Sequence, residues 1–464
     1  MNYLSITLCS FMAKSQFRSR CERIQIGKSL RDQIPRESHG IWQPPVDRRN
    51  PIDILEESNL DRLSELVPIR YGRMLRSPFT FLRGSASLMA YDFSTLPNIG
   101  VEVQACGDCH LLNFGLFATP ERNLVFDLND FDETHPAPWE WDLKRLVVSF
   151  VIAGRDNDFA DEDNREVVHH CVKSYREHLR EYSNMNPLEV WYSRLDMDRI
   201  IEESPDAKAK KAKEELAEKA RKRINENIFP KITTMVGGQH RFVEQPPVLF
   251  HPAQEDFDTI AQEALEEYRQ SLSDERLVLF DRYQLQDTAI KVVGIGSVGT
   301  RCLVSLFFSE DNHPLILQIK EARKSVLEPY TQKSIYENQG ERVVMGQRLM
   351  QSSSDIFLGW FRGRSGCDYY VRQLRDMKIS IPLDGYTLEQ MKNYAFYCGL
   401  TLARAHAKSG DSATISGYLG KGTKFDRAMG NFAISYANQV EEDYNLLVKA
   451  VKTNKLQAMI EDDL

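Results

Sequence analysis

The sequence lacks the features that would place the chain in a membrane or on an export pathway. It contains no run of about 18 consecutive apolar residues, the length that a membrane-spanning helix needs. Residues 1–12 are mildly apolar, but they have no basic beginning and no small-residue cleavage site, so we expect no signal peptide. These absences predict a cytoplasmic protein that does not associate with membranes.

An excess of positive charge is also absent. The chain has 59 Lys and Arg against 67 Asp and Glu, a net charge of −8, so we expect no nucleic-acid partner. Its 8 cysteines are scattered over 464 residues, which favours free thiols over a disulfide framework. The composition, 42% hydrophobic and 27% charged, is that of a globular protein with room for a large core.

The sequence does contain a cluster of acid and amide side chains in the first third of the chain. Asp108 is followed by Asn113 and, after short apolar strands expected at 114–118 and 124–128, by Asp127. A hairpin of these strands would bring Asp127 back beside Asn113. Phosphoryl transfer needs a carboxylate near the acceptor hydroxyl and oxygen ligands that hold Mg²⁺ on the nucleotide phosphates, and this segment supplies both.

The pattern Gly-Asp-x-His-x-x-Asn that contains Asp108 and Asn113, followed by a later Asp, resembles the catalytic and metal-binding loops of aminoglycoside and choline kinases. The resemblance implies that Asp108 is the catalytic base and that Asn113 and Asp127 bind Mg²⁺. Asp130, which begins an Asp-Phe pair, is the alternative second ligand, although the hairpin length favours Asp127. Asp142 resembles the structural aspartate that follows the hairpin in those enzymes.

Other interpretations of the same segment exist. The simplest is a polar turn capped by Asp and Asn side chains. Cys106-x-x-Cys109-His matches the c-type haem attachment pattern, but haem attachment requires export. The acidic run 127–133 is similar to a calcium loop, but Asp132 stands where an EF-hand needs glycine, and Phe131 stands where it needs an oxygen ligand.

A second cluster, rich in glycine, follows a strand expected at 289–293. Its Gly-x-Gly-x-x-Gly pattern is shared by dinucleotide-binding folds and kinase phosphate loops. A dinucleotide-binding loop must open a helix, whereas residues 300–308 are β-branched and aromatic and predict a second strand. A third strand at 315–319 ends at Lys320, and this order of strands, loop and lysine is that of a kinase small lobe.

These positions are therefore expected to bind a nucleotide. Glycines let backbone N–H groups approach the phosphates of ATP, and a lysine neutralises their charge. A glycine-rich hairpin with a surface lysine is the alternative. The candidate phosphate-binding residues are Gly294, Gly296, Ser297, Gly299 and Lys320.

Kinases also pair the phosphate lysine with a helix glutamate and hold adenine at a hinge. Glu341 lies in a helix expected at about 327–351 and is the candidate for the pair, with Glu337 as the alternative. The backbone near Gln373 and Leu374, after a strand expected at 369–374, is the candidate for binding adenine.

The order of the two clusters is the reverse of the usual one, because the glycine loop and lysine follow the catalytic segment. Circular permutation explains this order, and it is tolerated when the joined ends lie close together at the surface. The expected helix at 394–410 resembles the large-lobe helix that normally precedes the catalytic loop. Two independent coincidences are the alternative explanation.

Over residues 25–450 the chain also resembles the bacterial "domain of unknown function 2252" family. The resemblance rests on the stretches 77–84, 106–113, 126–133, 343–351 with 354–355, and 370–378. It implies a kinase-like fold and gives no substrate. Arg83, in the first stretch, could bind a phosphate or an acidic substrate or form a structural salt bridge.

We therefore expect an α+β, two-lobed, protein-kinase-like (aminoglycoside phosphotransferase-like) fold that is circularly permuted. Its activity would be ATP- and Mg²⁺-dependent phosphoryl transfer to a hydroxyl of a small molecule rather than a protein. A nucleotide-binding pseudokinase and a nucleotidyl (AMP) transferase are the alternatives, and the acceptor and oligomeric state stay open. The expected parts are an extended N-terminal arm (1–60), large-lobe helices with the catalytic hairpin (61–280), a small β-rich lobe (281–380) and closing helices (381–464).

Overall fold

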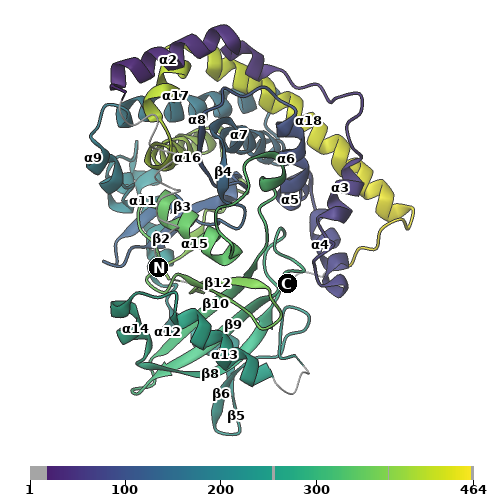
Figure 1. Cartoon of the computed structure of the whole chain (residues 1–464), viewed down its shortest axis with the longest axis vertical. Coiled ribbons are helices and arrows are strands. Elements are labelled where there is room, and N and C mark those ends of the chain that lie inside the picture. Colours follow the sequence, from purple (N-terminus) through teal and green to yellow (C-terminus); the bar gives the residue numbers. More distant parts are fainter. Residues whose placement is uncertain (1–17, 253–256, 375, 461–464) are drawn as a thin grey trace.

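The computed structural model of the chain describes residues 18–252, 257–374 and 376–460, so the apolar start at 1–12 lies outside the described residues. The fold is mixed α+β with several sheets. Figure 1 shows a β-rich part at the bottom and a helical part above it. Within the described ranges, no helix is both long and apolar enough to cross a bilayer.

The β-rich part is built on a six-stranded sheet with the order β11-β12-β10-β9-β8-β7. Every pair of neighbours in this sheet is antiparallel, and the strands follow the predicted order: the glycine loop 292–301 connects β8 to β9, and a turn at 310–313 connects β9 to β10. The strands are β7 (Leu249–Phe250), β8 (Tyr283–Lys291), β9 (Cys302–Ser309), β10 (Pro314–Ala322), β11 (Gly359–Arg362) and β12 (Asp368–Gln373).

Both faces of this sheet are covered. On β10, Leu315 and Leu317 pack against α13 and α14, whereas the intervening Ile316 packs with Phe242 and side chains of α12. This alternation is the two-residue period of a strand. Because α12, α13 and α14 cover the sheet, the β-rich part takes in residues well before 281, where the sequence analysis began it. The covering helices are α12 (Asn225–Ile232), α13 (Phe257–Arg269), α14 (Asp274–Phe280) and α15 (Gln339–Met350).

The hairpin expected from the sequence around Asp127 forms within the described structure. β2 (Phe114–Ala118) pairs with β3 (Leu124–Leu128), at the predicted bounds. The segment that precedes the hairpin contains β1 (Glu102–Ala105), and the segment that follows contains β4 (His135–Pro138); these two strands pair with each other. β13 (Ile379–Ser380) adds a third strand beside β2.

Long helices surround this hairpin. α7 (Trp139–Asp156) is buried along nearly its whole length, and its buried side chains include charged residues such as Asp142 and Arg145 as well as apolar ones. α8 (Asp161–Tyr182) packs along α16 (Leu388–Ser409), where Gly399 lets the backbone of α8 approach closely. The remaining helices and hairpin strands are α3 (Pro51–Glu57), α4 (Val67–Met74), α5 (Pro78–Gly84), α6 (Ala86–Ser94), α9 (Pro187–Tyr192), α10 (Met197–Glu202), α11 (Ala207–Arg221), β5 (Thr233–Val236) and β6 (Gln239–Phe242).

The N-terminal segment is not the extended arm that we expected at 1–60. Its described part contains α2 (Arg20–Gln33), which starts with a capping box at Ser19 and packs on α17 (Ser412–Leu419). Further along, Arg48 forms ion pairs with Asp92 of α6 at 2.8 Å and with Asp443 of α18 (Lys424–Lys452) at 2.7 Å. The proline-rich composition suggested an extended arm, whereas the described part of this segment packs on the C-terminal helices.

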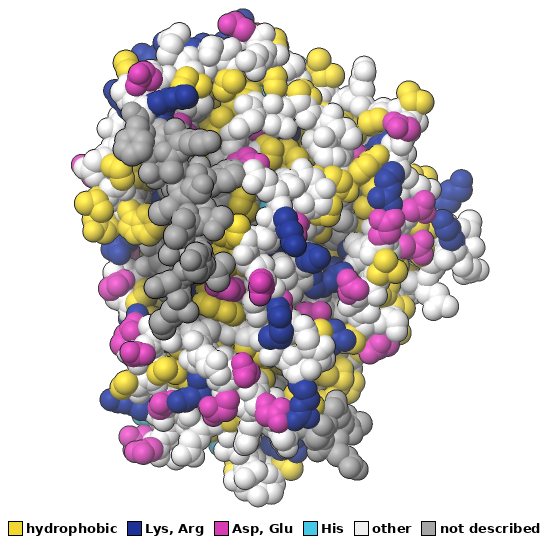
Figure 2. Space-filling view, in the orientation of Figure 1, with side chains coloured by type: hydrophobic (Ala, Val, Ile, Leu, Met, Phe, Trp, Pro, Cys, Tyr) yellow, Lys and Arg dark blue, Asp and Glu magenta, His cyan; other side chains and the backbone are white. Residues whose placement is uncertain are grey.

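The surface carries mixed charge. Figure 2 shows acidic and basic side chains interspersed over the face that it draws, as the near balance of 59 basic and 67 acidic residues leads us to expect. The absence of a nucleic-acid partner stays a prediction.

Candidate functional site

Lys320 joins the two clusters that the sequence analysis singled out. It lies near the end of β10, and its Nζ donates a hydrogen bond to Asp132 Oδ2 at 2.6 Å. The same Nζ lies 3.6 Å from Asp130 Oδ1. Tyr370, the partner of Lys320 on β12, projects from the same face of the sheet and donates its hydroxyl to Asp132 Oδ1 at 2.6 Å. The segment after β3 is thus bound directly to the six-stranded sheet.

The charges in this network support one another. Burial opposes the positive charge of Lys320, whose side chain is 3% exposed, but Asp130 and Asp132 raise its pKa well above the ordinary value. Burial likewise opposes ionisation of Asp130, yet Lys320, Arg372 and Lys378 together hold the pKa of this carboxyl below its usual range. At neutral pH the lysine and the aspartate are therefore both charged.

The glycine loop between β8 and β9 ends at the same aspartate. Gly294 and Gly299 adopt φ values of +68° and +86°, which glycine reaches without strain and a side chain would not. The carbonyl of Gly294 accepts a hydrogen bond from Arg73 Nη1 at 2.6 Å, so α4 holds the loop. Ser297 Oγ donates to Asp132 Oδ2 at 3.0 Å, which brings the loop onto the Lys320 network.

Gly296 brings the same loop near the catalytic segment. A Cβ atom at this position would lie 3.5 Å from the carbonyl oxygen of Arg83. Arg83 has no hydrogen bond and no ion pair with any described residue. Burial lowers the pKa of its guanidinium, and the nearby Asp108 and Asp130 oppose that effect. A cation without a direct partner in the described structure therefore lies near both Asp108 and Asp130.

The loop between β1 and β2 is positioned by α7. Asp142 accepts the backbone N–H of Cys106 at 2.6 Å and that of Gly107 at 3.0 Å. Asn113 fixes the other side, because its Oδ1 accepts the N–H of Asp130 at 2.6 Å and its Nδ2 donates to the Asp130 carbonyl at 2.9 Å. Asn113 and Asp130 are therefore held next to each other, in the way that a shared metal site requires.

Asp108 lies at the open side of this loop with its side chain 25% exposed. Its Oδ1 accepts a hydrogen bond from Arg145 Nε at 2.6 Å, and His110 Nε2 lies 3.8 Å from its Oδ2. Burial lowers the pKa of His110 to about 4, so this ring is neutral at pH 7 and forms no ion pair with the Asp108 carboxylate. Arg145 thus engages Oδ1 of Asp108, and no described residue donates a hydrogen bond to Oδ2.

Asp127 does not join the site, and its assignment as a magnesium ligand needs correction. It is fully buried, and its carboxylate is paired with Arg404 of α16 at 2.6 and 2.8 Å. The backbone N–H and hydroxyl of Ser352 also donate to it, each at 2.8 Å. In a strand, Asp127 points into the core, whereas Asp130 follows the strand and reaches the loop. Asp130, the alternative ligand, is the one beside Asn113 and Lys320.

Glu341 does not pair with Lys320 either. It lines a surface cavity of about 480 Å³ together with Glu337, Trp360 and Arg362. The neighbouring Arg342 points inward instead and donates from Nη2 to the carbonyl of Asp132 at 2.9 Å. An α-helix turns by about 100° per residue, so adjacent side chains point to different sides, and the ion pair expected with Glu341 is made by Asp132.

Gln373 is the last residue of β12, an inner strand of the sheet, and Leu374 follows it. The N–H of Gln373 donates to Asp355 Oδ2 at 2.5 Å, and the N–H of Leu374 donates to the carbonyl of Ile316 at 3.0 Å. Both amides have acceptors inside the protein, so neither is open to an adenine base in this conformation. The expected helix at 327–351 starts only at Gln339, after the cap Asn338.

The sequence analysis missed Asp132, Tyr370 and Arg342. Asp132 was considered only as a poor calcium ligand, although its place two residues after Asp130 was a signal for a second carboxylate at the lysine. Tyr370 could be found from strand pairing, because the alternation along 369–374 puts it on one face. Nothing in the sequence distinguishes Arg342 from a surface arginine.

The residues present fit a magnesium ion that is held partly by nucleotide phosphates. Within the described structure, no group of three or more His, Cys, Asp or Glu is arranged to bind a metal alone. Mg²⁺ commonly takes only one or two protein carboxylates and completes its shell with waters and phosphate oxygens. Asp130 Oδ1 is buried and has no hydrogen-bond donor, and Asn113 lies beside it, so both meet this smaller requirement.

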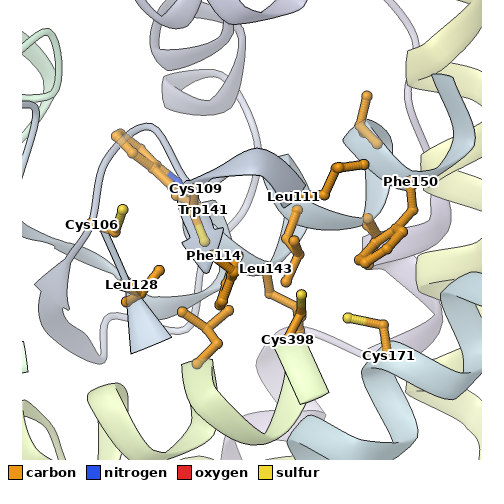
Figure 3. Close-up of a cluster of buried hydrophobic side chains, with 14 of the residues drawn as sticks. Cys106, Cys109, Leu111, Phe114, Leu128, Trp141, Leu143, Phe150, Cys171 and Cys398 are labelled. Atoms are coloured by element: carbon orange, nitrogen blue, oxygen red, sulfur yellow. The ribbon is translucent and has the colours of Figure 1, made fainter. Parts of the chain in front are cut away.

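The cysteines of the loop belong to the core. Figure 3 shows Cys106 and Cys109 among the apolar side chains of Phe114, Leu128 and Trp141, and all five lie in one buried cluster. A hydrogen bond with Cys109 opposes the shift, but burial raises the pKa of the Cys106 thiol to about 11. The seven described cysteines are free thiols, as expected. These two thiols are packed structural side chains.

The fold and the site define a class: a two-part α+β protein in which a glycine loop and a buried lysine on one part meet paired aspartates on the other. A family model described as "Uncharacterized protein conserved in bacteria (DUF2252)" matches residues 62–450. The chain belongs to this bacterial family, which confirms the family resemblance seen in the sequence. No curated protein and no solved structure gave a match.

Proposed function

We propose that the chain is an ATP- and Mg²⁺-dependent phosphotransferase with a kinase-like, circularly permuted fold, acting on a hydroxyl of a small molecule. The observation that carries this proposal is the contact of Lys320 with Asp132 at 2.6 Å and with Asp130 at 3.6 Å. Phosphoryl transfer needs a cation and backbone amides at the phosphates, and carboxylate ligands for the metal. The glycine loop, Lys320 and Asp130 bring these groups to one place.

The end of α16 supports the permutation. Ser409 Oγ accepts the backbone N–H of Gln104 at 3.2 Å, and a Cβ atom on Gly410 would lie 2.5 Å from Val103 Cγ1. The helix therefore ends against β1, the strand that leads into the catalytic loop. In kinases of ordinary order the large-lobe helix runs directly into this loop, so the spatial order is kept although the chain order is changed.

Each group of site residues has its own role in the proposed transfer reaction. Lys320 and the amides of residues 294–299 bind the phosphates, and Asp130 with Asn113 holds Mg²⁺. Asp108 orients the acceptor hydroxyl and accepts its proton, a role worth about 10²–10⁴-fold in rate in comparable systems. Bound Mg-ATP supplies the phosphoryl group and the counter-charge to Asp130. Lys320 then shares its charge between Asp130, Asp132 and the phosphates.

One observation favours a non-catalytic nucleotide-binding protein as the second candidate. Arg145 is buried and pairs with Asp108, so the candidate base already has a charged partner inside the protein. A pseudokinase would bind ATP through Lys320 without needing Asp108. Transfer of AMP, the third candidate, has no separate structural support.

Thermal-shift titration with ATP and Mg²⁺ tests the nucleotide site. Wild type should gain stability by mass action, about 2.7 kcal/mol when the ligand is at 100 times its Kd. Asp130→Ala should lose the Mg²⁺-dependent part, whereas Asp311→Ala, at an exposed turn, should behave as wild type. No shift in wild type at millimolar ATP would refute the proposal.

Labelled ATP then separates the three candidates. Incubation of the protein with a metabolite extract and γ-labelled ATP should transfer label to a small-molecule product, and Asp108→Asn should abolish transfer while keeping the thermal shift. Label that arrives only from α-labelled ATP would identify AMP transfer. Binding that is unaffected by Asp108→Asn, without any transfer, would identify the pseudokinase.

A further inference from the structure

A second polar cavity lies beside the Lys320 network, near the point where β12 leaves the sheet. It has a volume of about 50 Å³, and its lining includes Asn129, Gln347, Gln351, Arg372 and Lys378. A single water needs at least about 10–15 Å³ of such volume, so the cavity has room for roughly four water-sized groups. It is too small for a nucleotide and large enough for one small polar ligand.

Two basic side chains in this cavity form no direct ion pair with a described residue. Arg372 Nη1 and Lys378 Nζ both donate to the carbonyl oxygen of Asn129, at 3.2 and 2.9 Å. Within the described chain, neither has a carboxylate oxygen within 4 Å. Both side chains are partly buried, and a cation that is partly removed from water is commonly paired, because the loss of hydration is unfavourable without a partner.

The carboxylates nearby are already engaged. Asp355 accepts the N–H of Gln373 at 2.5 Å and that of Phe357 at 2.9 Å. Asp376, also in the lining, pairs with Arg122 at 2.6 Å. The two acids of the neighbouring network, Asp130 and Asp132, share the charge of Lys320. Positive charge in the cavity is thus left without a direct acidic partner.

Two amide side chains in the lining also lack partners. Both side-chain atoms of Asn129, which is 6% exposed, are buried without a hydrogen bond, and so is Oε1 of Gln347, which is 5% exposed. More than nine-tenths of buried polar groups in proteins are hydrogen-bonded. Two buried amide side chains with unpaired atoms therefore point to a ligand or water that binds between them. The cavity therefore offers one free amide donor and two free amide acceptors beside its two cations.

Gly115 shows that the place of the Asn129 amide is built into the fold. This residue of β2 lies under the side chain, and a Cβ atom on it would come 2.5 Å from Asn129 Nδ2. Any other residue at 115 would push the amide out of position. The backbone of the catalytic hairpin therefore leaves room for Asn129 to face the cavity.

We propose that this cavity binds a small oxyanion that carries a hydroxyl, such as hydrogen phosphate, between Arg372, Lys378 and the amides of Asn129 and Gln347. Its oxygens accept from the two cations and from Asn129 Nδ2, and its O–H donates to an amide oxygen. Charge-assisted hydrogen bonds of this kind are about twice as strong as neutral ones. The ligand is either free inorganic phosphate or the phosphate end of a small phosphate monoester. This site is separate from Lys320 and goes beyond the proposed transfer reaction.

Calorimetric titration with inorganic phosphate tests the proposal directly, at constant ionic strength set with chloride. Wild type should bind phosphate, and Lys378→Met and Arg372→Met should each weaken binding about tenfold or more. Lys333→Met, at an exposed position, should bind as wild type does, and Lys320→Met reports any phosphate that binds at the proposed nucleotide site instead. If either cavity variant fails to fold, Gln347→Leu and Asn129→Ala provide the same comparison without a change of charge.

Each outcome has a definite meaning. If wild type does not bind phosphate at about 10 mM, the proposal is overturned. Loss of phosphate binding only in Lys320→Met also overturns it. A response to adenosine that Asn129→Ala removes, without a response to phosphate, also overturns it, because the cavity then takes a base. Repetition with glycerol phosphate separates a monoester from free phosphate by relative affinity. ATP titration of Lys378→Met is independent: a kept ATP response with lost phosphate binding distinguishes this site from the transfer site.

Discussion

Lys320 and Asp132 are 188 residues apart in the chain, yet Lys320 Nζ and Asp132 Oδ2 lie 2.6 Å apart. The contact joins the six-stranded sheet to the loop that follows the catalytic hairpin. Tyr370 and Ser297 donate to the same carboxylate, so Asp132 keeps two partners if the lysine is removed. Asp132 is thus the residue on which both parts of the molecule converge.

Lys320→Met should therefore remove nucleotide binding while leaving the protein folded. The variant loses the cation that would bind the phosphates, and the remaining hydrogen bonds keep Asp132 in place. We expect the Kd for Mg-ATP to rise at least about tenfold, measured by calorimetry, which corresponds to about 1.4 kcal/mol. Lys324→Met, at an exposed position on the same segment, serves as the control. An unchanged Kd in Lys320→Met would contradict the assignment of the site.

Asp130 and Asp127 should respond to the same substitution in opposite ways. Asp127→Asn breaks the buried pair with Arg404, and loss of one partner of such a pair destabilises proteins by about 3–5 kcal/mol. Asp130→Asn, whose side chain is 47% exposed, should change stability little and remove the magnesium dependence of ATP binding. Urea denaturation and ATP titration with and without Mg²⁺ measure the two effects.

The double variant Asp127→Asn with Arg404→Met is the control for this comparison. Removal of both charges should recover part of the stability that Asp127→Asn loses, because no unpaired buried charge is left. If Asp127→Asn were as stable as wild type and its ATP binding no longer depended on Mg²⁺, Asp127 rather than Asp130 would be the magnesium ligand.

Asp127 and Asp130 also show which parts of the site could be predicted from the sequence. Short apolar runs at 114–118 and 124–128, separated by turn residues, predicted the hairpin at its observed bounds, because such a pattern is a local property. Which aspartate faces the site depends on Arg404, 277 residues away, and no local pattern contains that information. Lys320 was found because a strand and a glycine loop precede it, whereas Asp132, its actual partner, comes from a distant turn.

The prediction that Glu341 pairs with Lys320 was wrong for a similar reason. Spacing after Lys320 put Glu341 in a helix, but spacing does not fix the rotation of that helix about its axis. In the structure the packing of α15 turns Arg342 inward, where it donates to the backbone of Asp132. Rotation is set by contacts with β1 and β11 that only the folded chain defines.

Asp142→Ala should loosen the catalytic loop without removing a group that contacts substrate. The carboxylate accepts two successive N–H groups, those of Cys106 and Gly107, and alanine leaves both without an acceptor. An unsatisfied buried donor is unfavourable by about 1–3 kcal/mol. We expect faster amide hydrogen exchange at residues 106–108 and a lower rate of any phosphoryl transfer, with the Kd for Mg-ATP nearly unchanged. Unaltered exchange at these amides would show that Asp142 does not hold the loop.

The stability of the protein should depend on pH through Lys378. Burial, with a contribution from Arg372 and Lys320, lowers the pKa of Lys378 to about 7, although Asp130 and Asp355 oppose this shift. Between pH 7 and the ordinary value of about 10.4 the unfolded chain binds the additional proton, so the free energy of unfolding rises with pH. Below pH 7 both states are protonated and this dependence ends.

The variant Lys378→Met should remove that rise. The slope due to one group is at most about 1.4 kcal/mol per pH unit. Urea denaturation of wild type and variant at pH 7 and pH 9 measures the difference, and other titrating groups cancel because they are common to both proteins. Parallel pH profiles for the two proteins would show that Lys378 titrates normally.

The pair of Asp127 and Arg404 has a consequence for synthesis of the protein. Ribosomes add about 5–20 residues per second, so the 277 residues between them take roughly 15–55 seconds to make. During this interval the hairpin has emerged, but the arginine that neutralises its aspartate does not yet exist. The nascent chain must keep that carboxylate hydrated, and hence the hairpin unpacked, until almost all of the polypeptide has been translated. Products of premature termination before residue 404 should accordingly be substrates for chaperones and proteases.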